Sequence, residues 1–429
     1  MKIFIVCSNL RFGGAERVAA TLANSFYDRG HEMIISTNLF EKINYQLHDA
    51  IKVYKLVSTN SNKVKKWSSS VLLLRKQIKK HKPDAIIGIM PTCSLIAKLA
   101  SCGLQIPIIA TEHNSFERPS SAPFSKWSIF EKFYLNKLYP YITVLTEADK
   151  ELISKRFKNV AVMPNPLFIT PITEPSKKEK VVLAAGRVDD WHYKGLDVLL
   201  QAWSKIISNE QLEISNYDYS QDGKPSHWWL KIAGYGKKES FEYLMNLLPD
   251  GEWVALEAQD SSSNSFESDE RRKTKDENIK NNYVWKSEKY RIEFLGFRKD
   301  IEELYKKSKI FVLSSRYEGF GLVLIEAMSQ GCAPVACDYK GRQREILSPL
   351  QGDSLKVNGY SDHGIEVTEN GILCEPDDVD ALAAGLKKMI ENEKYRKQVQ
   401  QNAVERSKYY DMKHTMDRWE SYLSNIIKK

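Results

Sequence analysis

The sequence lacks the cysteine patterns of a disulfide framework or a zinc site. It has no C-x-x-C pair and no histidine at zinc-ligand spacing from a cysteine pair, although it contains six cysteines: Cys7, Cys93, Cys102, Cys332, Cys337 and Cys374. Scattered cysteines of this kind are typical of reduced core residues. We therefore expect free thiols in a cytoplasmic protein.

Long hydrophobic runs are also missing. No apolar run reaches the ~18–20 residues that a membrane-spanning helix needs. Lys2 leads directly into the strand-like run IFIVC, which gives way to polar Ser8 and Asn9 and is too short for the apolar part of a signal peptide. We expect a soluble protein or one attached peripherally to the inner face of the membrane.

Several kinds of catalytic site are missing as well. The sequence shows no Ser-His-Asp arrangement and no P-loop. Two acidic groups could suggest a metal, but Asp189 and Asp190 lie beside cations, and the run from Asp377 to Asp380 fits a helix N-cap. The sequence therefore predicts no metal and no resident cofactor.

Charge and length set broader limits. The formal net charge of +8 is modest for 429 residues and favours anionic partners such as a nucleotide, a diphosphate or an acidic membrane surface, without indicating nucleic acid. Single hydrophobic cores rarely grow beyond ~250–300 residues, so the chain is long enough for two or three domains.

The first part of the chain alternates strand-like and helix-like segments. Residues 2–7 form a buried strand pattern, glycines follow at 13 and 14, and an amphipathic helix pattern covers residues 15–28. Further strand-like runs are residues 32–37, 51–56, 84–90, 107–112 and 141–146. This alternation predicts an α/β fold with a doubly wound, mainly parallel sheet, whose ligands bind beyond the carboxyl ends of the strands.

A second α/β series begins after a proline-rich segment. Four prolines between residues 163 and 176 indicate a linker, and strand patterns return at residues 181–185, 229–233, 291–295, 310–313 and 333–337. We predict an N-terminal domain of residues 1–168, completed by 408–429, and a second domain of residues 169–407. Residues 257–289 are serine-rich, mixed in charge and poor in apolar groups, which predicts a flexible insertion.

Glycine turns follow several of the predicted strands. They contain Gly13 and Gly14 after the first strand, Gly234 within AGYG, and the segment from Gly186 to Gly195, whose Arg187 and Lys194 could both reach a diphosphate. Each turn is common on its own. The alternative for the two cations is an ordinary solvated surface.

The stretch RYEGFGLVLIEA, residues 316–327, joins a strand, a glycine turn and a helix. Such a helix N-terminus favours a phosphate, and Glu326 on the helix could accept two sugar hydroxyls, while Glu318 lies in the turn. The alternative is a pair of solvated acids. His113, in the loop TEHNS, is a candidate to bind a sugar hydroxyl, although a lone histidine is more often structural.

Glycine loops, two cations and carboxylates together fit a nucleotide-sugar. When a nucleoside diphosphate departs, negative charge develops on its phosphate, and fixed cations and helix N-termini can stabilise that charge without a divalent metal. The residues therefore indicate glycosyl transfer.

At this point the sequence resembles the retaining glycosyltransferases of family 4, which have the GT-B architecture of two Rossmann-like domains facing a central cleft. The matching motifs occur in family order over nearly the whole chain: FGGAER (12–17), TEHNS (111–115), MPNP (163–166), the segment 186–195, LGFRKD (295–300) and EGFGLVLIEAM (318–328). The chain departs from the family pattern in the insertion at 257–289 and in Tyr235 of AGYG, where the family usually has an acidic residue.

The resemblance implies a role for each matched residue. Arg187 and Lys194 would hold the donor diphosphate, Glu326 the ribose, and Gly14 would approach the phosphate. The backbone around Phe297 and Arg298 would bind the base. Glu318, with the amides of Phe320 and Gly321, would face the donor sugar, as would His113. The last helix would cross back onto the N-terminal domain, with Trp419 and Tyr422 as anchors.

The predicted activity is that of a retaining, metal-independent glycosyltransferase. It would move a hexose or an N-acetylhexosamine from a nucleotide-diphosphate sugar, with UDP favoured, to a polyprenyl-diphosphate-linked glycan in bacterial polysaccharide assembly. The alternatives are a GT-B nucleotide-sugar epimerase or hydrolase, and a non-catalytic subunit of a glycan-assembly complex. Residues 124–141 mix aromatics with lysines and could contact a membrane, or could pack as an amphipathic helix on the N-terminal sheet.

Overall fold

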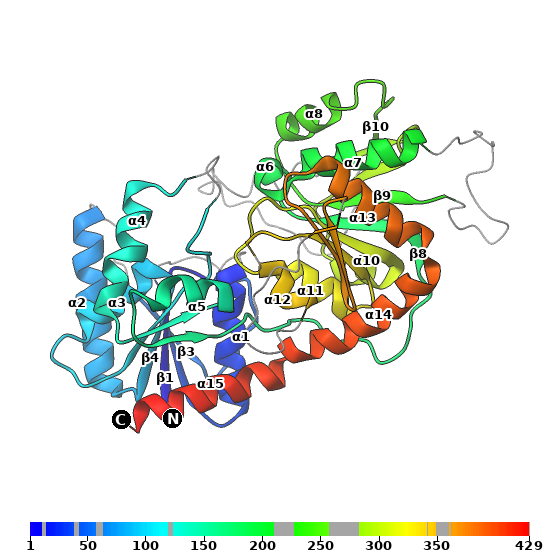
Figure 1. Ribbon diagram of the computed structural model, residues 1–429. Helices are drawn as coiled ribbons and strands as arrows, with labels where there is room; N and C mark the ends of the chain where they lie inside the picture. The colour runs from blue at the N-terminus through cyan, green and yellow to red at the C-terminus, as the bar shows by residue number, and fades with distance from the viewer. Residues whose placement is uncertain are drawn as a thin grey trace. The chain divides into compact units, whose positions relative to one another are not determined.

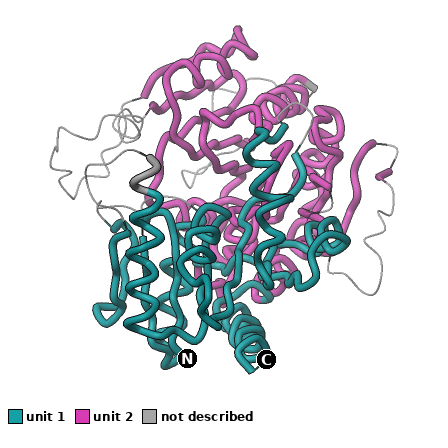
Figure 2. Tube along the Cα trace, turned by 90° about the vertical axis from the view of Figure 1, so that its left-hand side faces the viewer, with its two compact units in different colours: residues 1–168, 409–429 teal, residues 169–408 magenta. Residues whose placement is uncertain are grey.

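The chain folds into two compact units. The computed structural model describes residues 1–10, 14–37, 43–56, 63–118, 123–209, 227–256, 283–340, 342–348, 360–361 and 363–428. Unit 1 comprises Met1–Phe168 and Tyr409–Lys429, and unit 2 comprises Ile169–Lys408 (Figure 2). The sequence placed the boundary after residue 168, and the chain passes from one unit to the other within the proline-rich segment.

Unit 1 is built on a seven-stranded parallel sheet with the order β3-β2-β1-β4-β5-β6-β7. Figure 1 labels β1, β3 and β4 of this sheet. Its strands are β1 (Lys2–Cys7), β2 (Glu32–Thr37), β3 (Lys52–Lys55), β4 (Ala85–Ile89), β5 (Ile108–Thr111), β6 (Tyr141–Val144) and β7 (Val160–Val162). The strand order reverses between β1 and β4, because the chain moves outward in one direction up to β3 and in the other from β4. The sequence analysis missed β7, a short strand of three residues.

Helices cover both faces of this sheet. They are α1 (Gly14–Asp28), α2 (Lys63–His81), α3 (Pro91–Ala100), α4 (Lys126–Phe133), α5 (Glu147–Ser154), α15 (Met412–Ile427) and the 3-10 segment η1 (Leu135–Leu138). One buried cluster contains apolar residues of α1 and α15, and another contains those of α2, α3 and α5. Their positions at helical spacing explain why each helix packs along one face.

The last helix belongs to unit 1, which confirms the predicted return of the chain. Trp419 is buried, and its ring lies 6.5 Å from that of Phe26 in α1. Arg29 also donates to Asp417 at 2.7 Å and to Glu420 at 2.8 Å. The helix is therefore held by an apolar face and by an ion-paired edge.

Unit 2 is built on a nine-stranded sheet with the order β10-β11-β12-β9-β8-β13-β14-β16-β15. Its strands are β8 (Glu179–Ala185), β9 (Trp229–Ala233), β10 (Val254–Leu256), β11 (Val284–Ser287), β12 (Ile292–Gly296), β13 (Ser308–Leu313), β14 (Ala333–Cys337), β15 (Ile365–Thr368) and β16 (Gly371–Cys374). The six central strands are parallel, whereas β10, β11 and β15 pair antiparallel at the two edges.

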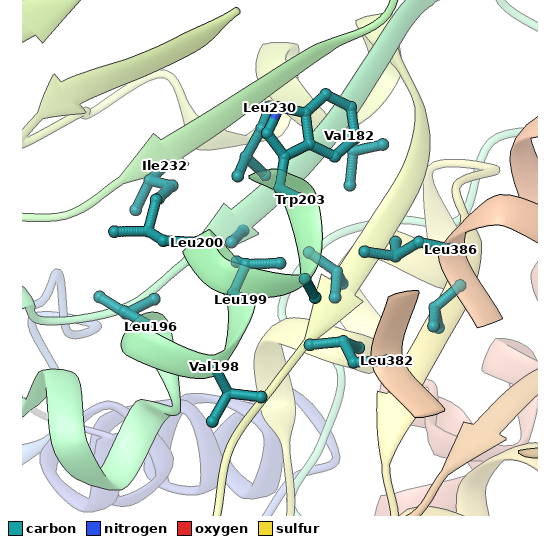
Figure 3. Close-up of a cluster of buried hydrophobic side chains, with 14 of the residues drawn as sticks. Val182, Leu196, Val198, Leu199, Leu200, Trp203, Leu230, Ile232, Leu382 and Leu386 are labelled. Atoms are coloured by element: carbon teal, nitrogen blue, oxygen red, sulfur yellow. The ribbon is translucent and has the colours of Figure 1, made fainter. Parts of the chain in front are cut away.

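The helices of unit 2 are α6 (Trp191–Lys194), α7 (Leu196–Asn209), α8 (Lys238–Asn246), α10 (Ile301–Lys307), α11 (Leu322–Ser329), α12 (Arg342–Leu347), α13 (Val379–Glu391) and α14 (Glu393–Ser407). Trp203 of α7 is fully buried in a cluster with strand residues and with Leu382 and Leu386 of α13 (Figure 3). The fold is thus α/β with two parallel-sheet units, as the sequence predicted.

The predicted insertion at 257–289 is wrong at its end. Val284–Ser287 forms strand β11, which pairs with both β10 and β12. The reason is local: Trp285 pairs with Phe294 across the ladder, and the ring of Tyr283 lies 5.9 Å from that of Phe241. These aromatic contacts supply the apolar burial that the preceding serine-rich run lacks. Residues 257–282 of the predicted insertion lie outside the described residues.

Candidate functional site

The predicted donor residues of unit 2 gather where its strand order reverses. From β8 the chain proceeds to β9 and β12 on one side, whereas β13, β14 and β16 lie on the other. Parallel strands β8 and β13 are neighbours, so the loops that follow them leave the same edge side by side. Ligands of doubly wound sheets bind in the crevice at this position. Arg187 and Lys194 follow β8, and Glu318 follows β13.

Lys194 contacts Glu318 directly. Its Nζ donates to Oε1 of Glu318 at 2.5 Å, and the hydroxyl of Ser315 donates to the same oxygen at 2.9 Å. The two charged side chains are 26% and 13% exposed, so the pair is largely shielded but still reachable from solvent. The sequence predicted both residues for the site, and the structure joins them across 124 positions.

A glycine in the left-handed region places Lys194 against strand β13. Gly195 ends α6 with φ of 59°, and an added Cβ would lie 2.0 Å from the carbonyl oxygen of Ser314. The Ser314 hydroxyl in turn donates to the carbonyl of Lys194 at 2.8 Å. Only glycine allows this close approach of two backbones.

Arg316 ties the same two loops together, and the sequence analysis gave it no role. Its guanidinium donates to both carboxylate oxygens of Asp197 at 2.7 and 2.9 Å, and to the carbonyl of His192 at 2.8 Å. It also donates to Asp377 at 2.6 Å. A bidentate pair of this kind fixes geometry as well as charge, so Arg316 holds the loop of Glu318 against the segment that carries Lys194.

Arg187 stands in a more open position. Its side chain is 47% exposed, and its nitrogens lie 3.6 Å from Asp190 and 4.0 Å from Asp189. These long contacts in solvent hold an arginine only weakly. Asp189 is instead engaged by the start of α8, where it accepts from the amide of Lys237 at 2.7 Å. Arg187 can therefore turn toward an anion without breaking a strong ion pair.

Gly234 of AGYG, which the sequence analysis assigned to the donor site, is required by the packing of the fold. An added Cβ at Gly234 would lie 1.7 Å from the carbonyl oxygen of Gly186. The turns after β8 and β9 therefore pass too close to each other for any side chain at this position. Close packing of two turns explains Gly234 without any ligand, and its predicted contact with the donor stays a prediction.

The glycine turn after β13 leads into α11 as predicted. Gly321 caps the helix with φ of 97°, and Phe320 beside it is 5% exposed. Glu326 lies one turn further on, also 5% exposed, and Oε2 accepts from the hydroxyl of Tyr305 at 3.4 Å. A shielded carboxylate near a helix N-terminus suits a pair of ribose hydroxyls, and this role stays a prediction.

The loop after β12 carries the residues predicted to bind the base. Arg298 forms a two-pronged pair with Asp300, at 2.8 and 2.6 Å, and its hydrogen bond holds the pKa of the Asp300 carboxyl below its usual value. The ring of Phe297 lies 5.9 Å from that of Tyr235 in the turn after β9. Loops of neighbouring strands thus meet here, and base binding at their backbone stays a prediction.

In unit 1, His113 follows β5 and has contacts on both ring nitrogens. Nδ1 lies 3.1 Å from Oδ1 of Asn165, and Nε2 lies 3.1 Å from Oγ1 of Thr111. Burial lowers the pKa of His113 to about 4, with Lys132 contributing in the same direction and the Asn165 hydrogen bond opposing it. The imidazole is therefore neutral at physiological pH, which suits a hydrogen-bonding role better than that of a cation.

The loop of His113 rests on a buried ion pair that the sequence analysis missed. Lys132 of α4 donates to Glu112 at 2.7 Å and to the carbonyl of Asn114 at 3.1 Å, so it holds the residues on both sides of the histidine. Asn136 donates to the other oxygen of Glu112 at 3.1 Å. No local pattern connects these residues, because they lie 18 to 24 positions apart.

One further predicted position lies at the start of α1. Gly14 is the first residue of that helix, and nothing lies within 4 Å of an added Cβ there. Gly13 lies outside the described residues.

Within the ranges that the structure describes, no group of three or more His, Cys, Asp or Glu side chains could hold a metal ion. No helix of the described part is long and apolar enough to cross a membrane.

Comparison with known proteins matches each of the two units to a glycosyltransferase family model. The family model described as Glycosyltransferase Family 4 matches residues 12–167, and the one described as Glycosyl transferases group 1 matches residues 275–406. The first match lies in unit 1 and the second in unit 2.

Two curated relatives match almost end to end. The chain is 27% identical to the GalNAc-alpha-(1->4)-GalNAc-alpha-(1->3)-diNAcBac-PP-undecaprenol alpha-1,4-N-acetyl-D-galactosaminyltransferase of Campylobacter jejuni, with 99% of each chain covered. It is 24% identical to the amylovoran biosynthesis glycosyltransferase AmsD of Erwinia amylovora, with 96% of each covered.

Solved structures share the fold. Sucrose-phosphate synthase of Thermosynechococcus elongatus aligns with a TM-score of 0.69 at 14% identity, covering 100% of both chains. Anabaena HepE in complex with UDP and glucose aligns with a TM-score of 0.67 at 18% identity, covering 99% of this chain and 100% of that one. The two family matches in chain order, on two α/β units of the kind found in these GT-B enzymes, identify the chain as a GT-B glycosyltransferase of the family 4 type.

Proposed function

We propose that this glycosyltransferase is retaining and metal-independent. It moves a hexose or an N-acetylhexosamine from a nucleotide-diphosphate sugar, with UDP favoured, to a glycan linked to polyprenyl diphosphate. The proposed use of a nucleotide-sugar donor rests on the ion pair between Lys194 and Glu318, which lies where the strand order of unit 2 reverses. The acceptor half is supported by the diphospho-undecaprenol glycan in the names of two Campylobacter jejuni relatives.

In this proposal the donor diphosphate takes Lys194 as its partner. The lysine already lies at the mouth of the site in contact with one carboxylate, and the exposed Arg187 can swing to the same phosphates. Arg187 would bind two phosphate oxygens at once, and Lys194 would act as a point charge. Both stabilise the negative charge that develops on the leaving phosphate.

The chemical step exchanges one bond for another at the anomeric carbon. The bond from that carbon to the diphosphate oxygen breaks, and a bond to the acceptor hydroxyl oxygen forms on the same face of the sugar. The proton of that hydroxyl passes to the departing phosphate, so the charge balances without a metal. Glu318, released from Lys194 when the diphosphate binds, orients the sugar hydroxyls and is not assigned as a nucleophile.

A donor panel tests this proposal. The full chain is incubated with UDP- and GDP-sugars, with and without a polyprenyl-diphosphate-linked glycan, and the released nucleotide and the glycan product are measured. We expect release that requires the acceptor, an unchanged rate in excess EDTA, and a product with the donor's anomeric configuration. Rapid release of nucleotide without any acceptor would instead identify a hydrolase, and conversion of the donor into another nucleotide-sugar would identify an epimerase. Strict dependence on a divalent metal would contradict the proposed chemistry.

Variants connect the activity to the site. Removing one preorganised group that stabilises transition-state charge typically costs about 10²–10³ in kcat, and we expect a loss of that order for Lys194→Met. Lys205→Met is a matched control, because Lys205 also pairs with a carboxylate in unit 2 but lies on the exposed outer side of α7. Near-normal turnover of Lys194→Met would rule out its assigned role.

A further inference from the structure

Helix α4 and the residues that follow it present several large apolar side chains to solvent. Trp127 is 60% exposed, Phe130 44%, Tyr134 58% and Leu138 46%. We call these four residues the aromatic stripe. Its three aromatic members follow each other at three- and four-residue intervals along α4 up to its C-cap, so they lie on one side of the helix, and Leu138 of η1 continues the stripe. The rings of Trp127 and Phe130 are 5.6 Å apart, and those of Phe130 and Tyr134 are stacked at 6.0 Å.

The opposite side of the same segment buries two polar side chains together with Phe133, which packs against the apolar core of unit 1. Lys132 is 5% exposed and forms the ion pair with Glu112, and Asn136 is fully buried against the same carboxylate. Lys132 also lies 4.4 Å from the ring of Phe116. A surface helix of a globular protein normally buries its apolar side and exposes its charges. Here Phe133 makes the apolar contact with the core, while Trp127, Phe130 and Tyr134 stay exposed, so packing on the N-terminal sheet does not account for the stripe.

Basic groups accompany the stripe. Lys126 and Lys137 are exposed, and Lys137 lies 5.8 Å from the Tyr134 ring. Glu131 is the one acidic residue between positions 123 and 140, and it accepts a hydrogen bond from Thr92 of α3 at 3.2 Å. Tryptophan and tyrosine with flanking lysines are the side chains that favour the headgroup layer of a bilayer.

The place of the stripe in unit 1 also fits a lipid surface. Lys132 holds Glu112 and Asn114, the two residues that flank His113. The segment with the stripe is therefore fixed to the loop at the carboxyl ends of the strands of unit 1, where doubly wound sheets bind their ligands. A stripe seated on a membrane would bring this edge of unit 1 to the surface in which a polyprenyl-linked acceptor is embedded.

We propose that the aromatic stripe docks on an anionic lipid bilayer, with Lys126 and Lys137 on the lipid phosphates. This inference rests on the proposed lipid-linked acceptor. A second copy of the chain is a weaker candidate for the occupant, because four partly exposed side chains offer on the order of 400 Å². Stable protein interfaces bury about 800 Å² on each partner. A bilayer needs no such area, since charge attraction adds to the apolar contact.

Vesicle binding by the full chain tests the proposal. Vesicles of phosphatidylglycerol and phosphatidylcholine, and vesicles of phosphatidylcholine alone, are sedimented with the wild-type protein and with Trp127→Ser/Phe130→Ser. We expect binding to the anionic vesicles and at least a tenfold loss of affinity in this variant. Lys126→Glu/Lys137→Glu should lose binding to anionic vesicles, and the binding of the wild-type protein should weaken as salt is raised.

Leu152→Ser is the matched control, because Leu152 is a large apolar residue of unit 1 that is 41% exposed and lies on α5. It should bind vesicles as the wild type does. Thermal unfolding of every variant should match the wild type, since the substituted side chains are exposed. Unchanged vesicle binding by Trp127→Ser/Phe130→Ser would overturn the proposal. A wild-type dimer in light scattering that this variant dissociates would show that the stripe is an interface between copies.

Activity separates this inference from the proposed function. The stripe variant should transfer sugar normally to an acceptor with a short, water-soluble lipid and poorly to the same acceptor embedded in vesicles. Equal transfer to both acceptors by the stripe variant would contradict the membrane proposal and leave the proposed function unaffected. Intact vesicle binding without transfer to either acceptor, in the wild-type protein, would sink the proposed function alone.

Discussion

The contact between Lys194 and Glu318 makes a prediction that needs no substrate. The perturbation is a double-mutant cycle of Lys194→Met, Glu318→Gln and both together. Methionine keeps most of the lysine stem, and glutamine keeps the shape of the carboxylate while removing its charge. The cycle isolates the interaction between the two side chains, provided that neither substitution creates a new contact.

The expected coupling follows from the burial of the pair. Exposed ion pairs are worth up to about 1 kcal/mol, and hydrogen bonds to charged groups about 1.5–3 kcal/mol. The 2.5 Å contact between side chains that are 26% and 13% exposed lies between these cases, so we expect about 1–2 kcal/mol. Lys194→Met alone should be the most destabilising, because it leaves the Glu318 carboxylate with the Ser315 hydroxyl but without its cation.

The assay is urea unfolding of the full chain, monitored by tryptophan fluorescence. This signal reports on unit 2, because most of the nine tryptophans lie there. The pair of Lys205 and Asp380 supplies the matched cycle. It has a 2.6 Å contact in the same unit, but its side chains are 49% and 82% exposed, and we expect a coupling below about 0.5 kcal/mol. If the two cycles give equal couplings, burial does not strengthen the Lys194 pair and the reasoning is wrong.

Two further predictions concern single positions. Gly234→Ala should lower the free energy of unfolding by more than about 2 kcal/mol, because its Cβ would lie 1.7 Å from the Gly186 carbonyl, whereas Gly14→Ala, with nothing within 4 Å, should change it by less than about 0.5 kcal/mol in urea titrations. A similar loss in both would contradict the close packing. The pKa of His113 is lowered to about 4, so as the pH falls the unfolded chain binds a proton at this histidine before the folded chain does. The free energy of unfolding should therefore fall by up to about 3 kcal/mol between pH 6.5 and pH 4. This fall should be absent in His113→Gln, and NMR titration should show a higher pKa for His113 in Asn165→Asp; an unchanged pKa would remove the role of Asn165.

Much of the fold could be predicted because its central strands are buried on both faces. The strands predicted at residues 32–37, 229–233 and 333–337 have those bounds in the structure. Such strands appear as continuous apolar runs, with a helix pattern before the next one. The alternation alone was enough to predict two parallel α/β domains.

Most short strands at or near the sheet edges could not be predicted in the same way, although the edge strand β3 falls within the strand predicted at residues 51–56. Strands β7, β10, β11, β15 and β16 have three or four residues each; β7, β10 and β15 lie at a sheet edge, and β11 and β16 lie one strand further in. A short edge strand is half-exposed and has no long apolar run to reveal it. Val284–Ser287, one strand in from the edge, is just as short, and it is ordered by pairing with β10 and β12 and not by its own composition.

In the candidate site, some residues could be predicted from the sequence and the residues that hold them in place could not. Lys194 and Glu318 could be predicted as neighbours of one site because each follows a strand within a glycine turn. The residues that hold them had no such signal. Arg316 meets Asp197 across 119 positions, and nothing near either residue in the sequence selects the other as its partner. The reversal of strand order between β8 and β13 brings them together, because it sends the two loops out from adjacent strands. Sequence patterns therefore predict groups that present backbone or charge to a ligand, whereas the ion pairs that align those groups emerge only once the topology has made distant loops neighbours.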